Sequence, residues 1–97
     1  MKRAEILDEI WEVIEDRAAH PSEESYTSKI LTHRKGIDKS LEKIGEESTE
    51  VVIAAKNESK EEAVYEISDL IYHLTVLMNY MGVTFEEIGA ELLKRSR

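Results

Sequence analysis

The chain has 97 residues, no cysteine and a formal net charge of −8. The length predicts one domain that spans residues 1–97, and the absence of cysteine excludes a disulfide framework and a zinc–thiolate site. The acidic charge argues against broad binding to nucleic acid or to an anionic membrane, so an anionic substrate would need a metal ion or a local basic cluster.

No stretch reaches the roughly 18 apolar residues that a membrane-spanning helix needs, and the first residues lack the apolar run of a signal peptide. With the absence of cysteine, this predicts a cytoplasmic protein. One proline and four glycines in the whole chain favour helix throughout. A chain of this size buries only about two thirds of its unfolded surface, which makes oligomerisation a natural supplement.

The first predicted helix covers residues 2–18, where apolar residues recur at helical spacing. These residues are Ile6, Leu7, Ile10, Trp11, Val13 and Ile14. Such a stripe is typical of packing against a core or a dimer interface. The helix should end before His20, because Pro21 biases His20 away from helical backbone angles.

Residues 25–36 form the only basic-leaning part of the chain and predict one or two helical turns followed by a loop that ends at Gly36. Hydroxyl and basic side chains in this segment can hydrogen-bond phosphates. They are Ser25, Tyr26, Thr27, Lys29, Arg34 and Lys35. The alternative interpretation is a helix N-cap followed by a solvated basic loop.

The second major helix is predicted over residues 37–56. Its apolar arc consists of Ile37, Leu41, Ile44, Ser48, Val51, Val52 and Ala55. Gly45 falls in the same arc, and because a mid-helix glycine costs about 1 kcal/mol relative to alanine, its position predicts the close approach of another helix.

Charged residues lie together beside this arc: Lys39, Lys43, Glu46, Glu47 and Glu50. Glu47 lies nearest the edge of the core, Glu50 next, and Glu46 farthest out. A carboxylate at the edge of a core is costly unless it is paired or bound to a metal. The pattern therefore favours Glu47 and Glu50 over Glu46 as metal ligands.

The third major helix is predicted over residues 60–81, with Ser59 and Glu62 as a capping box at its start and Gly82 at its end. Its apolar arc consists of Ala63, Ile67, Leu70, Ile71, Leu74, Leu77, Met78 and Met81. Along one flank lie Glu66, Asp69 and His73. His73 either hydrogen-bonds Asp69, contacts a substrate, or is a histidine at the edge of the core whose hydrogen bonds a neighbour satisfies.

A last helix, over residues 85–95, begins at a second capping box formed by Thr84 and Glu87.

Carboxylates three residues apart share one helix face, as Glu47 and Glu50 do, and again Glu66 and Asp69. Antiparallel helices joined by a short turn would bring the two pairs together across a cleft. Oxygen-only ligands favour a hard cation such as Mg²⁺, and bound Mg²⁺ suggests phosphate chemistry. A carboxylate outside the metal shell could then accept the proton of an attacking water. Outer phosphates could be held by Lys29, Lys39 and Lys43.

Acid spacing by itself is also compatible with a solvated charged face, because Glu-x-x-Glu recurs by chance in acidic helical proteins. A di-iron site is disfavoured, since ferritin-like sites need Glu-x-x-His on two helices and no such pair exists here.

From about Ile6 to Leu93 the chain resembles the phosphoribosyl-ATP pyrophosphohydrolases of the all-α NTP pyrophosphatase (MazG-like) superfamily. The superfamily pattern is Glu-Glu-x-x-Glu, a spacer, then Glu-x-x-Asp. It is met by Glu46, Glu47 and Glu50, fifteen intervening residues, then Glu66 and Asp69. Segments typical of the histidine-pathway branch are residues 25–27, 43–47, 51–56 and 69–77.

This resemblance implies an all-α, MazG-like bundle of four to five helices, completed by formation of a homodimer. It implies hydrolysis of phosphoribosyl-ATP to phosphoribosyl-AMP and pyrophosphate in the cytoplasm, with Mg²⁺ as cofactor and Mn²⁺ as a substitute. The implied metal ligands are Glu47, Glu50, Glu66 and Asp69, with Glu46 as a further ligand or the base. The implied substrate contacts are Ser25, Tyr26, Thr27, Lys29, Lys39, Lys43 and His73.

Two other hypotheses fit the same residues. One is a MazG-like house-cleaning pyrophosphatase acting on ordinary or damaged nucleoside triphosphates, which would share the metal site. The other is a non-enzymatic helical dimer or interaction module whose acids are merely solvated.

Overall fold

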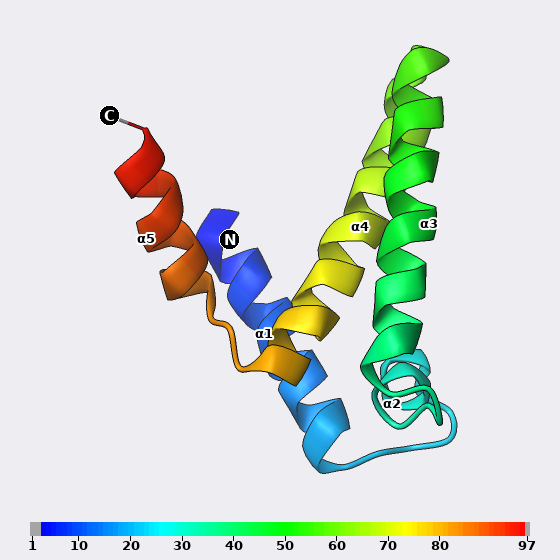
Figure 1. Ribbon diagram of the computed structural model, residues 1–97, viewed down its shortest axis with the longest axis vertical. Helices are drawn as coiled ribbons and strands as arrows, with labels where there is room; N and C mark the ends of the chain where they lie inside the picture. Colours follow the sequence, from blue (N-terminus) through cyan, green and yellow to red (C-terminus); the bar gives the residue numbers. More distant parts are fainter. Residues whose placement is uncertain (1–2, 97) are drawn as a thin grey trace.

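The computed structural model describes residues 3–96, and this part of the chain contains helices and no strand (Figure 1). The helices are α1 (Arg3–Ala19), α2 (Tyr26–Leu31), α3 (Ile37–Lys56), α4 (Lys60–Met81) and α5 (Phe85–Arg95). The predicted all-α class is confirmed, and the predicted helix ends within the described residues lie within a residue or two of the observed bounds; the predicted helix start at residue 2 lies outside the described residues.

Helices α3 and α4 form a long antiparallel hairpin that rises away from the rest of the molecule (Figure 1). The turn between them is short because Asn57 ends α3 and the Ser59 hydroxyl accepts a hydrogen bond from the Glu62 backbone N–H at the start of α4. Glu58 occupies the left-handed region between them, with a φ of 54°. Only this half of the predicted Ser59–Glu62 capping box is present in the described chain, whereas Thr84 and Glu87 form both halves of theirs.

The core lies where α1, α2 and the C-terminal half of α4 meet, and its fully buried members are Ile14, Ile30 and Val76. Tyr80 packs against this core, and its hydroxyl donates to the carbonyls of Ile30 (2.9 Å) and Leu31 (2.7 Å) at the end of α2. This contact ties the short helix α2 to α4.

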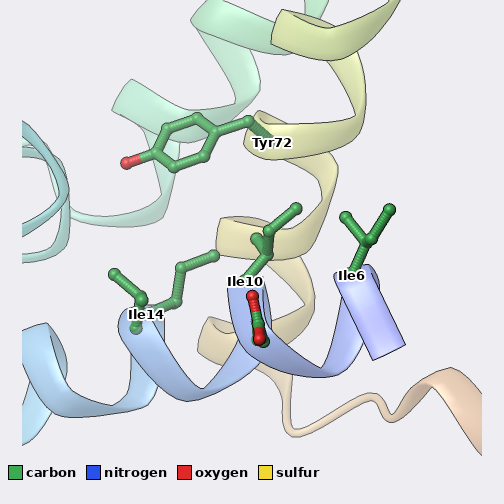
Figure 2. Close-up of a pocket in the computed structure, with 6 residues that line it drawn as sticks. Ile6, Ile10, Ile14 and Tyr72 are labelled. Atoms are coloured by element: carbon green, nitrogen blue, oxygen red, sulfur yellow. The ribbon is translucent and has the colours of Figure 1, made fainter. Parts of the chain in front are cut away.

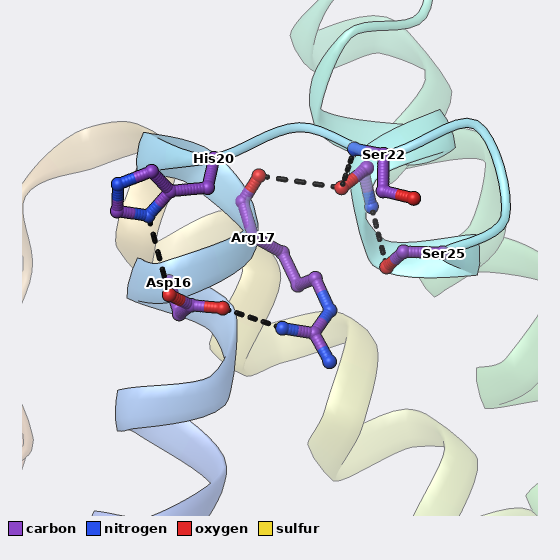
Figure 3. Close-up of polar contacts among 6 residues, drawn as sticks. Asp16, Arg17, His20, Ser22 and Ser25 are labelled. Carbon is purple, nitrogen blue, oxygen red and sulfur yellow. Dashed lines mark hydrogen bonds and ion pairs between the residues drawn. The ribbon is translucent and has the colours of Figure 1, made fainter.

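The start of α2 is tied to α1 through Ser28, which is 1% exposed. Its hydroxyl donates to the Arg17 carbonyl (3.3 Å) and accepts from the Ser22 backbone N–H (3.0 Å). Figure 3 shows Arg17 and Ser22 with the dashed lines that mark these bonds. The Ser25 hydroxyl caps α2 by accepting from the Ser28 N–H (3.2 Å). These bonds fix the joint between the two helices.

An apolar pocket of about 270 Å³ lies between α1 and α4. Figure 2 shows Ile6, Ile10 and Ile14 in a row along α1, with Tyr72 reaching over them from α4. Tyr72 thus lies at the border between this pocket and the start of α2.

The apolar arcs of the two long helices are largely exposed along the hairpin, so the described residues of the chain do not cover them. We call a set of exposed apolar residues on α3 and α4 the hairpin apolar face; it consists of Leu41, Val52, Ile67, Ile71 and Leu74 from the predicted arcs, together with Val64. Gly45 is also exposed, and a Cβ placed on it would meet no atom within 4 Å. The close approach predicted at Gly45 is therefore absent within the described chain, because that side of α3 faces away from α4.

Helix α5 contacts the rest of the molecule near its beginning, where the Phe85 ring meets Trp11 edge-on at 5.6 Å. Farther along, Leu92 and Leu93 are 62% and 70% exposed. None of the helices in the described residues is long and apolar enough to cross a membrane.

Candidate metal and substrate site

Three carboxylates meet across the α3–α4 hairpin, as the acid spacing predicts. Glu47 of α3 and Glu66 and Asp69 of α4 each offer an oxygen, and these oxygens lie within 4.8 Å of one another. The antiparallel pairing brings the middle of α3 opposite the first half of α4, while the three-residue spacing puts Glu66 and Asp69 on one face. All three residues are partly buried.

The structure does not bring Glu50 and Glu46 into this trio. Glu50 is exposed, although its charge still acts on Glu66. Glu46 is exposed and pairs with Lys43 at 3.1 Å. Of the acids that the sequence pattern groups together, these two therefore lie outside the cluster of three.

Crowding of like charge is visible in the trio. Partial burial raises the pKa of Glu66 above its ordinary value, and the neighbouring carboxylates of Glu50, Glu47 and Asp69 raise this pKa further. The charged form of this side chain is therefore disfavoured unless a cation is present.

The trio fits a hard divalent cation on two grounds. Its donors are carboxylate oxygens alone, which Mg²⁺ prefers, and a cation would relieve the repulsion that acts on Glu66. Two oxygens bound to one Mg²⁺ lie about 3–4 Å apart, since each bond is about 2.0–2.1 Å long. Small rotamer changes would therefore suffice for the three carboxylates to share one ion.

An aromatic group adjoins the carboxylates. The Tyr26 ring stacks on the Tyr72 ring, with 6.2 Å between the ring centroids. The His73 ring meets both edge-on, with its centroid 5.9 Å from that of Tyr26 and 5.1 Å from that of Tyr72. The hydroxyl of Tyr72 shares a hydrogen bond with the Thr27 hydroxyl. The predicted residues Tyr26, Thr27 and His73, from two helices, are thus brought together.

The charges that act on Tyr26 include those of two carboxylates of the trio. Burial raises the Tyr26 pKa, Lys43 lowers it, and Tyr72, Glu47 and Asp69 raise it further. The Tyr26 ring is nevertheless 51% exposed, so it stands at the edge of the site where a bound molecule can reach it.

His73 is 3% exposed and its Nδ1 has no hydrogen-bond partner within residues 3–96. Burial lowers the pKa of His73, which favours the neutral imidazole, while Glu47 and Asp69 partly oppose this shift of the pKa. An unpaired buried polar group costs roughly 1–3 kcal/mol. His73 is therefore compatible with a role toward a ligand rather than with a satisfied core position.

The three lysines predicted to contact substrate lie in different parts of the structure. Lys43 lies at the site, and its hydrogen bond to Glu46 raises the Lys43 pKa, as do the charges of Tyr26 and Glu47, against the opposing effect of burial. Lys39 lies 3.9 Å from Glu42. Lys29 lines a separate pocket with Pro21, Ser22, Glu23 and Thr32.

Ser25 serves as the N-cap of α2. Part of the alternative interpretation of residues 25–36, a cap followed by a loop, is therefore correct for Ser25, whose hydroxyl accepts from the Ser28 N–H.

Tyr72 is the site neighbour that sequence reasoning missed. It lies in a largely apolar stretch of α4, where the sequence pattern predicts that a tyrosine simply packs in the core. Its hydrogen bond to Thr27, 45 positions earlier, is what connects it with the site. The signals available in the sequence were its place directly before His73 and within the family-typical segment 69–77.

Known proteins resemble this chain over nearly its whole length. The sequence profile described as phosphoribosyl-ATP pyrophosphohydrolase matches residues 7–96. The chain belongs to this family. It is 50% identical to the phosphoribosyl-ATP pyrophosphatase of Methanoculleus marisnigri, with the whole of both chains covered.

Other relatives show the same relation. The chain is 51% identical to the phosphoribosyl-ATP pyrophosphatase of Methanocella arvoryzae, over 97% of this chain and 99% of that one. It is 56% identical to the histidine biosynthesis bifunctional protein HisIE of Thermoanaerobacter pseudethanolicus, over 93% of this chain but 41% of that protein. This family is thus found both as a separate chain and as part of a longer protein.

Proposed function

We propose that the chain hydrolyses phosphoribosyl-ATP to phosphoribosyl-AMP and pyrophosphate, a step of histidine biosynthesis. The observation that carries this proposal is the convergence of Glu47, Glu66 and Asp69 across the hairpin, in a chain that belongs to the phosphoribosyl-ATP pyrophosphohydrolase family. In the reaction, water adds its oxygen to the α-phosphorus, the bond from that phosphorus to the bridging oxygen breaks, and pyrophosphate leaves.

The carboxylate trio is the proposed site for Mg²⁺, with Mn²⁺ as a substitute. Such an ion neutralises charge on phosphate oxygens and lowers the pKa of a bound water. The trio's partial burial and the unfavourable charge of Glu66 support this assignment. The net charge of −8 supports it too, because a polyphosphate would otherwise be repelled.

The other side chains of the site bind, orient and move protons. Lys43 supplies positive charge to a phosphate oxygen, and Tyr26 presents a half-exposed ring and hydroxyl beside it. A carboxylate outside the trio, Glu50 or Glu46, accepts the proton of the attacking water. The buried Nδ1 of His73, which has no hydrogen-bond partner within residues 3–96, supports a role of this ring toward the substrate.

The proposal includes a homodimer formed through the hairpin apolar face. Helical periodicity puts this face on the flank of the hairpin opposite the carboxylate trio, so a second copy could cover it and leave the site open. Gly45 supports the same contact. A mid-helix glycine costs about 1 kcal/mol relative to alanine, and a Cβ built on Gly45 would meet no atom within 4 Å in the described residues, so nothing there requires a glycine. We assign the enzyme to the cytoplasm, with which its lack of cysteine is compatible.

The test is pyrophosphate release from phosphoribosyl-ATP, with and without Mg²⁺, by the wild type, Glu47→Gln and Asp69→Asn. We expect metal-dependent release that falls by at least about a hundredfold in both variants, because each removes charge from the metal shell. Glu61→Gln, an exposed acid on the same helix as Asp69, is the control and should stay near wild type.

Other outcomes assign the chain differently. Equal turnover of plain dNTPs would indicate a house-cleaning pyrophosphatase with the same metal site. If no substrate is turned over and neither Mg²⁺ nor Mn²⁺ raises the melting temperature, the chain is a helical scaffold, since a ligand that binds only the folded state must stabilise it.

A further inference from the structure

Tyr72 contacts residues of the site from two helices. From α4 its hydroxyl bonds the Thr27 hydroxyl, its ring stacks on Tyr26 and its edge meets His73. Thr27 is 7% exposed, so this hydroxyl pair is shielded from water. One side chain therefore contacts two consecutive residues of α2 and the histidine beside the carboxylates.

Helix α2 needs such contacts because it has only six residues. Isolated helices shorter than about 12–15 residues are marginal in water, so the position of α2 depends on what holds it. Its start carries Tyr26, which lies within the electrostatic reach of Lys43, Glu47 and Asp69. A small shift of this helix would move Tyr26 relative to the carboxylates.

We propose that Tyr72 is a positioning residue, whose hydroxyl holds the start of α2 so that Tyr26 faces a substrate bound at the carboxylate trio. This inference rests on the proposed function and assigns a role to a residue outside the predicted site. Burial raises the pKa of Tyr72, so its hydroxyl keeps its proton at neutral pH and the bond to Thr27 is one between neutral groups.

The chain offers a matched control in Tyr80. Its hydroxyl also joins α4 to α2, but it bonds the carbonyls of Ile30 and Leu31 at the opposite end of the short helix. Tyr72→Phe and Tyr80→Phe each remove one oxygen and one tie to α2. They differ in which end of α2 is released.

The experiment measures kcat and KM for phosphoribosyl-ATP, together with melting temperatures, for the wild type and both variants. We expect Tyr72→Phe to lower kcat/KM by about tenfold to a hundredfold, mostly in kcat, because a misplacement of about 1 Å near a reacting centre can cost a hundredfold. Tyr80→Phe should lower the melting temperature by a similar amount while kcat/KM stays within about twofold of wild type. Equal losses of activity in the two variants, or none in Tyr72→Phe, would overturn the positioning role.

Two further measurements separate this inference from others. Thr27→Val removes the other hydroxyl of the pair, so it should reproduce the loss in Tyr72→Phe, and the double variant should lose little more, since coupled residues are non-additive. The rise in melting temperature caused by Mg²⁺ should be the same in Tyr72→Phe as in wild type, because the trio is untouched; a smaller rise would contradict the inference. If the wild type releases no pyrophosphate from any substrate, the proposed function itself fails, and the inference with it.

Discussion

At the scale of single residues, the carboxylate trio that is proposed to bind a metal ion should destabilise the metal-free fold. Three like charges within 4.8 Å repel one another in the metal-free protein. We predict that Glu66→Gln raises the melting temperature in EDTA, because it removes one of these charges. The same variant should lose most of the stabilisation by Mg²⁺, which for an intact site is about 2.7 kcal/mol when the ion is present at a hundred times its Kd.

The pH dependence of the metal-free protein checks this prediction. The pKa of Glu66 in the folded chain lies above its ordinary value of 4.5, so the folded state takes up this proton before the unfolded state does. Stability should therefore rise as the pH falls through the folded pKa toward 4.5. Glu66→Gln should lack that part of the rise, and Glu61→Gln should retain it. A lower metal-free melting temperature in Glu66→Gln would refute the repulsion.

Two features of individual residues could not be predicted from the sequence. Spacing predicted four metal ligands, and the structure brings three together, because a helical wheel gives the direction of a side chain but not its distance from the neighbouring helix. Glu50 has the right direction and stays exposed. The link from Tyr72 to Thr27 spans 45 positions, and no local pattern encodes it.

At the scale of elements, the turn between α3 and α4 carries a residue in an unfavourable conformation. Glu58 has a φ of 54°, which costs an L-residue about 1–2 kcal/mol, whereas glycine adopts it freely. We predict that Glu58→Gly stabilises the fold by up to about 1 kcal/mol, after the loss of about 0.5–1 kcal/mol from the greater freedom of glycine when unfolded. In a chain of this size, 1 kcal/mol shifts the melting temperature by about 4–8 °C.

Glu12→Gly is the comparison for this prediction. Glu12 is exposed in the middle of α1, where the backbone is helical, so glycine there should destabilise the fold by about 1 kcal/mol. Opposite signs in thermal unfolding are the expected result. Destabilisation in both variants would mean that the conformation of Glu58 carries no strain.

The elements themselves were well predicted because their limits are local. Ser59, Gly82 and Thr84 cap helices through contacts within a few residues, and such signals can be recognised in a sequence. What the pattern could not supply was the packing of α2, which depends on Tyr80 and Ser28 reaching distant backbone groups.

At the scale of the whole molecule, hydrophobic periodicity identified apolar faces but not what covers them. The core within the chain is small, with Ile14, Ile30 and Val76 at its centre, and most of the arc predicted for the hairpin is exposed. A periodic stripe looks the same in a sequence whether its partner is the same chain or another copy. The proposed homodimer accounts for the difference.

The last prediction tests that homodimer through Ile71, a member of the hairpin apolar face that is 41% exposed. We expect the wild type to sediment at about twice the chain mass of 11.2 kDa, and Ile71→Lys to sediment as the monomer, because burying an unpaired ammonium in an apolar contact is strongly unfavourable. Its melting temperature should also be lower, since association stabilises the folded state by mass action, and that of the wild type should rise with protein concentration. Glu61→Lys places the same charge at an exposed acidic position on α4 and should leave the dimer intact. A wild type that stays monomeric at every concentration, or a dimeric Ile71→Lys, would show that the hairpin apolar face does not join two copies.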